Sequence, residues 1–124
     1  MPDNACECGE APTLIFSCSG GSDVGEIADK AARKMSVEKL GKVYCLAGIG
    51  GHVSGIVKTT ESAAKILVID GCPVDCGKKS LEHAGFAEFS HIRITDIGME
   101  KGKSPATNER VNEILEKGRM ILGT

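Results

Sequence analysis

Four segments of this chain have the residue pattern of β-strands. Residues 13–18 and 66–69 are short, uninterrupted apolar runs, which are typical of strands buried on both faces of a parallel sheet. A third apolar run covers residues 42–47. Residues 88–95 instead alternate apolar with polar side chains, which favours a strand at a sheet edge. The pattern therefore predicts three apolar strands and one amphipathic edge strand.

Segments with helical periodicity separate these strands. Ser22 is a good N-cap, and apolar residues then repeat at helical spacing. They are Val24, Ile27, Ala28, Ala31, Ala32 and Met35. Shorter helices are predicted at about 54–63 and from Cys76 to Ala84, the latter stopped by Gly85. A last helix is expected to start at Ser104-Pro105. Its predicted buried stripe is Val111, Ile114, Leu115, Gly118 and Leu122.

This alternation of strands and helices predicts the fold class. Strands that alternate with helices imply parallel strands joined by right-handed crossovers. We therefore expect a single α/β domain over residues 13–124, a three-layer α/β/α sandwich of the Rossmann or flavodoxin type with a four-stranded parallel sheet. The expected strand order is 2-1-3-4, since it places the cysteine-bearing strands side by side. Residues 1–12 are predicted to form a flexible arm that carries Cys6 and Cys8.

Composition and charge exclude several classes of partner. The chain has 124 residues, with 15 basic and 17 acidic side chains and a net charge of −2. No basic cluster is larger than a pair, so neither nucleic acid nor an anionic membrane surface is an expected partner. No apolar run approaches the roughly 20 residues that span a bilayer. The first residues lack a charged and apolar leader, so we expect a cytoplasmic protein.

Cysteine is the residue type that points to chemistry. The chain has six cysteines, and a reducing compartment favours metal binding or thiol chemistry over disulfides. Cys18 ends the first predicted strand, Cys45 lies near the end of the second, and Cys72 ends the third, with Cys76 one turn further. Parallel strands end at one shared edge, about 4.8 Å apart. Because zinc takes four sulfurs in a tetrahedron, the sequence predicts a zinc site made of Cys18, Cys45, Cys72 and Cys76.

Other uses of these cysteines remain open from the sequence. Cys45 lies inside an apolar run and is also compatible with simple core packing. Four thiolates would leave zinc no open position, which indicates a structural or metal-handling role, whereas three would leave one for catalysis. Thiol-based redox or sulfur-transfer chemistry at Cys72 and Cys76 is the main alternative. Their Cys-x3-Cys spacing differs from the Cys-x-x-Cys of thioredoxin-like motifs, which lowers that option.

Two glycine-rich turns suggest a further alternative, a small-anion site. One turn covers residues 48–52 and the other residues 19–22, and each precedes a predicted helix. Helix N-termini approached through glycine bind anions, so a small anion is expected near Gly50, Gly51 and Ser22. Neither turn has the Lys-Ser/Thr of a P-loop, and tight βα turns also explain the glycines. His52 is the histidine expected at this edge, while His83 and His91 are expected on the surface.

Several motifs together resemble a known family. Cys18-Ser19-Gly20, the run 45–51, and Asp70-Gly71-Cys72 followed by Cys76 are similar to the motifs of the DGC-domain family, named after its Asp-Gly-Cys sequence. The resemblance runs from about Thr13 to the C-terminal helix. It implies zinc binding through four cysteines, which are the four named above. It implies no substrate, reaction, catalytic residue, partner protein or oligomeric state.

Overall fold

The computed structural model describes residues 11–18 and 20–123. Most of the predicted arm at 1–12, including Cys6 and Cys8, lies outside these residues. In the part that is described, no helix is both long and apolar enough to cross a membrane.

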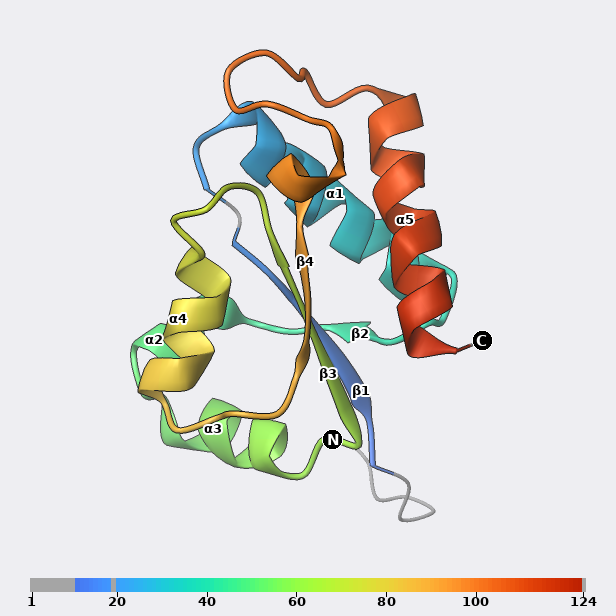
Figure 1. Cartoon of the computed structure of the whole chain (residues 1–124). Coiled ribbons are helices and arrows are strands. Elements are labelled where there is room, and N and C mark those ends of the chain that lie inside the picture. Colours follow the sequence, from blue (N-terminus) through green and yellow to red (C-terminus); the bar gives the residue numbers. More distant parts are fainter. Residues whose placement is uncertain (1–10, 19, 124) are drawn as a thin grey trace.

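A parallel sheet of four strands forms the centre of the molecule (Figure 1). Its strands are β1 (Thr13–Ser17), β2 (Lys42–Val43), β3 (Lys65–Asp70) and β4 (Ser90–Arg93). Their order is β2-β1-β3-β4, and each neighbouring pair is parallel. The predicted fold class and strand order are thus confirmed. All four strands end at the same edge of the sheet, and Cys18, Cys45 and Cys72 each come one or two residues after a strand end.

Helices cover both faces of the sheet. The helical elements are α1 (Asp23–Val37), α2 (Leu46–Gly50), α3 (Ser54–Glu61), α4 (Cys76–His83), the 3₁₀ helix η2 (Ile94–Ile97) and α5 (Asn108–Leu122). Helices α1 and α5 lie on one face, and α2, α3 and α4 lie on the other (Figure 1). Successive residues of β1 point to opposite faces of the sheet. Ile15 packs in the core under α1 and α5, while Leu14 and Phe16 pack in the core under the shorter helices.

Helix α1 forms as its sequence predicts. The Ser22 hydroxyl accepts a hydrogen bond from the Gly25 N–H at 3.1 Å and caps the helix. All six predicted apolar positions are buried. On the same face of the sheet, the predicted stripe of α5 is buried as well.

Several boundaries differ from the prediction. The edge strand predicted at 88–95 is shorter, since β4 covers Ser90–Arg93 and the next residues form η2. Strand β2 stops at Val43 instead of continuing to Ala47, because Leu46 begins helix α2. This helix buries Ile49 in the core, and Gly48 gives it room beside α3, where an added Cβ would lie 2.2 Å from Ile56 Cδ1. Cys45 is therefore the N-cap of α2 and not a strand residue.

The start of the last helix also differs from the prediction. Helix α5 begins at Asn108, after an N-cap at Thr107 whose hydroxyl accepts from the Arg110 N–H. Ser104 does not cap it, since the Ser104 hydroxyl accepts from the Glu100 N–H and its own N–H donates to Asp23. The connection is thus anchored to α1 before the helix starts.

Candidate functional site

The four candidate cysteines lie at the end of the sheet where the strands terminate. Cys18 directly follows β1, Cys72 lies two residues after β3, and Cys76 is the first residue of α4. Cys18 and Cys72 are half-buried, whereas Cys45 and Cys76 are exposed. All four are free thiols. The sequence therefore predicted the edge correctly, although Cys45 reaches it from a helix N-terminus.

Three of these thiols line one hollow, which we call the three-thiol pocket. Its volume is about 270 Å³. It is bounded by Cys18 from the end of β1 and by Cys72 and Cys76 from the turn between β3 and α4. The remaining lining residues are Gly20, Gly21, Ser22, Asp70, Gly71, Val74, Asp75 and Lys101. Two separate strand ends and one helix start thus contribute sulfur to a single small volume.

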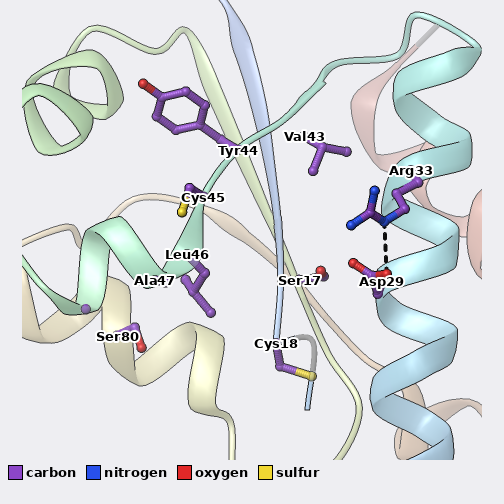
Figure 2. Close-up of a pocket in the computed structure, with 11 residues that line it drawn as sticks. Ser17, Cys18, Asp29, Arg33, Val43, Tyr44, Cys45, Leu46, Ala47 and Ser80 are labelled. Carbon is purple, nitrogen blue, oxygen red and sulfur yellow. Dashed lines mark hydrogen bonds and ion pairs between the residues drawn. The ribbon is translucent and has the colours of Figure 1, made fainter. Parts of the chain in front are cut away.

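Cys45 lines a second, larger pocket of about 580 Å³. Figure 2 shows this pocket, with Cys45 on the wall formed by the start of α2 and Cys18 at the end of β1. Its opposite wall carries an ion pair on α1, in which Arg33 Nε donates to Asp29 Oδ2 at 2.9 Å. Because Cys18 lines both pockets, the two hollows adjoin at this residue.

The spacing of the sulfurs is wider than in a closed metal site. No three of the four thiols have their sulfur atoms all within 4.8 Å of one another; across residues 11–18 and 20–123, the group that meets this distance is Asp70, Asp75 and His91. Tetrahedral zinc needs each sulfur about 2.3 Å from the ion. The donor chemistry of the four thiols fits zinc. The predicted convergence of all four sulfurs on one small volume is not seen, because Cys45 lines the larger pocket and no three of the sulfurs lie within 4.8 Å of one another.

Asp70, the first residue of the Asp-Gly-Cys motif, caps the helix that carries Cys76. Its two carboxylate oxygens accept hydrogen bonds from the N–H groups of Gly77 at 2.7 Å and Lys78 at 3.0 Å. Only 1% of Asp70 is exposed, so these bonds are shielded from water. Negative charge at a helix N-terminus is favourable because the exposed N–H groups and the helix dipole are positive there. Asp70 therefore fixes α4 against the end of β3.

His91 completes the surroundings of Asp70. The His91 Nε2 atom, on β4, lies 2.8 Å from Asp70 Oδ2 and 3.8 Å from Asp75 Oδ1. The prediction that His91 is a plain surface residue is wrong, because its side chain faces this buried carboxylate. The group Asp70, Asp75 and His91 has the spacing of a cation site, but the carboxylates already accept N–H groups from the protein.

Asp75 forms the strained part of the turn between the two thiols. Its backbone is left-handed (φ 58°, ψ 46°), a conformation that costs a residue other than glycine roughly 1–3 kcal/mol. Arg93 of β4 holds the Asp75 carboxylate through two bonds, of 2.9 Å from Nε and 2.5 Å from the terminal nitrogen. This hydrogen-bonded ion pair keeps the pKa of Asp75 below its ordinary value of 3.8 and raises the pKa of Arg93.

Two donors contact the sulfur atoms of the three-thiol pocket. The Gly71 N–H lies 3.4 Å from Cys18 Sγ, and the Lys101 ammonium lies 3.8 Å from Cys72 Sγ. N–H groups and cations near sulfur offset the negative charge of metal-bound thiolates. Lys101 comes from the loop before α5, and no sequence motif marked it.

His52 and the glycine-rich turn after Cys45 differ from expectation. His52 does not line either thiol pocket; its ring packs edge-on against His83 at the far end of α4, with centroids 5.3 Å apart. Gly50 and Gly51 form the C-terminal end of α2, and the Gly51 N–H donates to the Ala47 carbonyl at 2.8 Å. The anion site predicted near Gly50, Gly51 and Ser22 stays a prediction.

Comparison with known proteins matches the chain to one family and one relative. The family model described as "DGC domain" matches residues 14–117. A curated protein of Pseudomonas aeruginosa, the anaerobic and virulence modulator AnvM, is 33% identical over 88 residues. That alignment covers 71% of this chain and 67% of the relative. No solved structure gives a significant match.

Proposed function

This chain belongs to the DGC-domain family, and we propose that it binds and handles zinc through Cys18, Cys45, Cys72 and Cys76. The observation that carries the proposal is the three-thiol pocket, in which Cys18, Cys72 and Cys76 line a single hollow. Three sulfurs already make up most of the ligand set of a structural or transport site for zinc. Sulfur ligands also favour zinc over the harder cations that prefer oxygen.

Cys45 supplies the fourth sulfur in this proposal. It lies in the adjoining pocket, which shares Cys18 with the three-thiol pocket. It is exposed and stands at the start of a short helix, so its side chain is not confined by core packing. The alternative that Cys45 merely fills the core finds no support in this exposure. With Cys45 bound, zinc has no open position for a substrate.

A metal-handling role suits this arrangement better than a structural role. The fold buries two apolar cores built from aliphatic and aromatic side chains, with Cys18 and Cys72 packed against the edge of one of them. A core of this size forms without a metal, so we expect the fold to stay intact when the ion is removed. Two of the four proposed ligands, Cys45 and Cys76, are exposed, which leaves the ion within reach of a competing thiol or chelator. The name of the relative, a modulator of anaerobic life and virulence, is compatible with such a role but does not specify it.

The experiment is elemental analysis of protein purified without added metal. We expect about one zinc per chain in the wild type and strong loss in Cys72→Ser and Cys18→Ser. Circular dichroism after chelation should stay close to that of the zinc-bound protein, because the core forms without the ion. The matched control is the double variant Cys6→Ser/Cys8→Ser, which removes two cysteines outside the proposed ligand set and should keep its zinc. The proposal is contradicted if this control loses its zinc, or if the wild-type protein contains no zinc.

Thiol chemistry at Cys72 and Cys76 is the second candidate. The observation in its favour is that both free thiols open onto the same pocket and one of them, Cys76, is exposed. A redox or sulfur-transfer protein would contain zinc far below one ion per chain. It would also have one thiol that iodoacetamide alkylates much faster than the others near neutral pH. The same purified protein therefore distinguishes the two candidates.

A further inference from the structure

The turn that separates Cys72 from Cys76 is held by a residue of another strand. Within this turn, the Asp75 N–H donates to the Cys72 carbonyl at 3.1 Å, and the Asp75 carbonyl accepts from the Lys79 N–H at 2.8 Å. Asp75 thus connects the backbone of one proposed ligand to the first turn of the helix that begins with the other. Its left-handed backbone is one that residues with a side chain rarely adopt. An interaction outside the turn helps to hold this conformation.

The Asp75 side chain shows where that interaction is. A residue in this position commonly caps its own helix, but the carboxylate of Asp75 makes no capping bond. Asp70 caps α4 in its place, and Asp75 turns toward β4. There the Arg93 guanidinium binds both of its oxygens, a two-pronged geometry that fixes direction as well as distance. Asp75 is 7% exposed, so its carboxylate is largely shielded from water, while the Arg93 side chain is partly exposed.

Arg93 is itself fixed by the sheet. It is the last residue of β4 and lies beside Asp70 in the register of β3 and β4. Its guanidinium also contacts Asp96 at 3.2 Å, which restrains the side chain from the solvent side. The groups that face Asp75 are thus Arg93 and His91 from β4, with Lys78 from α4 contributing positive charge. A strand of the central sheet is in this way connected to the turn that carries two of the proposed ligands.

We propose that Arg93, acting through Asp75, is a positioning residue that sets the distance between the Cys72 and Cys76 sulfurs. The inference rests on the proposed zinc function for its purpose, but its geometry can be tested without zinc. Metal ligands must be placed to within a fraction of an ångström, and residues that orient them typically change metal affinity 10- to 100-fold when removed. The pair would then hold the Cys-x3-Cys turn ready for the ion in the metal-free protein.

The first measurement is zinc affinity, determined by competition with a chromophoric chelator. We expect Arg93→Ala to weaken binding about 10- to 100-fold. Arg93→Lys keeps the positive charge but cannot make both hydrogen bonds to the Asp75 carboxylate, so its zinc affinity should lie between those of Arg93→Ala and wild type. In a Cys76→Ser background, Arg93→Ala should add less than about twofold, because the ligand it positions is gone. An equal loss in both backgrounds would show a general stability effect and overturn the inference. Arg110→Ala, on α5, is the matched arginine control.

The second measurement needs no metal. Dibromobimane bridges two nearby thiols, and peptide mass mapping quantifies the Cys72–Cys76 link in metal-free protein. Arg93→Ala should slow this bridging several-fold, while alkylation of each single thiol by iodoacetamide stays within about twofold of wild type. Unchanged bridging overturns the inference even if zinc binds. If wild type binds no zinc but Arg93→Ala still slows bridging, the proposed function fails and the positioning role stands.

A further variant separates loss of positioning from loss of stability. Arg93→Ala leaves the Asp75 carboxylate buried without its partner, which by itself destabilises the fold. Asp75→Asn/Arg93→Ala removes that buried charge while keeping a side chain of the same size at the left-handed position, so the contact with Arg93 is lost without a lone buried carboxylate. This double variant should fold, as judged by circular dichroism, and should still bridge its thiols several-fold more slowly than wild type. Wild-type bridging in the double variant overturns the inference.

Discussion

The backbone N–H of Gly71 donates to the sulfur of Cys18 at 3.4 Å, so the middle residue of the Asp-Gly-Cys motif contacts the thiol at the end of the neighbouring strand. The same glycine touches helix α1 from its other side. An added Cβ on Gly71 would lie 2.8 Å from the Gly25 nitrogen and 2.8 Å from the Val24 carbonyl carbon, which are backbone atoms that cannot rotate away. The three residues of the motif thus have different structural roles, since Asp70 caps α4, Gly71 permits close approach to α1, and Cys72 lines the pocket.

The close approach at Gly71 predicts a stability cost for any side chain there. Gly71→Ala should lower the free energy of unfolding by about 1–3 kcal/mol, because the new methyl group forces backbone apart in a packed region. Urea denaturation followed by circular dichroism measures this cost. The matched control is Gly55→Ala on α3, where an added Cβ meets nothing within 4 Å. That control should be neutral or stabilising, since alanine favours a helix more than glycine does. Equal stability of the two variants would contradict the prediction.

Asp70→Asn should destabilise the start of α4. The asparagine side chain keeps one acceptor oxygen, and its amide group would face an N–H donor of Gly77 or Lys78. A buried N–H that loses its partner costs about 1–3 kcal/mol. Urea denaturation should show this loss. Hydrogen exchange should show faster exchange at those two amides.

The control for Asp70→Asn removes the same charge where no buried bond depends on it. Glu113→Gln lies on the exposed face of α5 and should change stability by less than about 0.5 kcal/mol. If the two variants lose the same stability, net charge and not capping is the cause. Unchanged amide exchange at the start of α4 would also contradict a capping role for Asp70.

The fold could be predicted from the sequence because its signals are local and periodic. The surroundings of the thiols could not be predicted in this way. The stripe of α1 repeats at helical spacing over four turns, which strongly favours an amphipathic helix. Residues 42–47 form a short apolar run, which is compatible with a strand or with the start of a buried helix. In the structure, helix α2 forms and buries Ile49 in the core. Cys45 was therefore assigned to the correct edge but to the wrong element.

The partners of the motif carboxylates were missed for a different reason. His91 lies 21 residues from Asp70, and Arg93 lies 18 residues from Asp75, so their pairing depends on the order of strands. A usable signal existed in β4, where charged side chains alternate with Ile92 on a strand expected beside β3. Once the order 2-1-3-4 is assumed, those polar positions come next to Asp70 at the end of β3 and to the turn that follows it.

Asp23 gives the protein a predicted pH dependence in acidic solution. Its carboxylate accepts hydrogen bonds from the N–H groups of Gly102 at 2.9 Å and Ser104 at 3.0 Å, which lower the pKa of Asp23 from its ordinary value of 3.8. A carboxyl with a depressed pKa adds stability that is complete above its unfolded value and is lost as pH falls through the lower, folded value. Stability should therefore fall below about pH 4.

Asp23→Asn tests this dependence. The variant should unfold more easily at pH 7, and its stability should change less between pH 5 and pH 3 than that of the wild type, because one shifted carboxyl is gone. Urea denaturation of metal-free protein at each pH provides the measurement. Asp29→Asn, an exchange of the same type further along α1, serves as a comparison. A parallel pH profile for wild type and Asp23→Asn would contradict the prediction.

The contact between Lys101 and Cys72 predicts that the lysine charge strengthens zinc binding, provided that zinc binds as proposed. Its ammonium lies 3.8 Å from Cys72 Sγ, at a surface position where a charge pair at this distance is worth about 1 kcal/mol. Lys101→Met should therefore weaken zinc binding about fivefold at low salt, and added salt should reduce the difference because it screens exposed charges. Lys103→Met removes the same charge two residues away, where the ammonium contacts Glu100 at 3.9 Å instead of a sulfur. If both variants weaken binding equally, the effect comes from net charge, and the contact between Lys101 and Cys72 contributes nothing of its own.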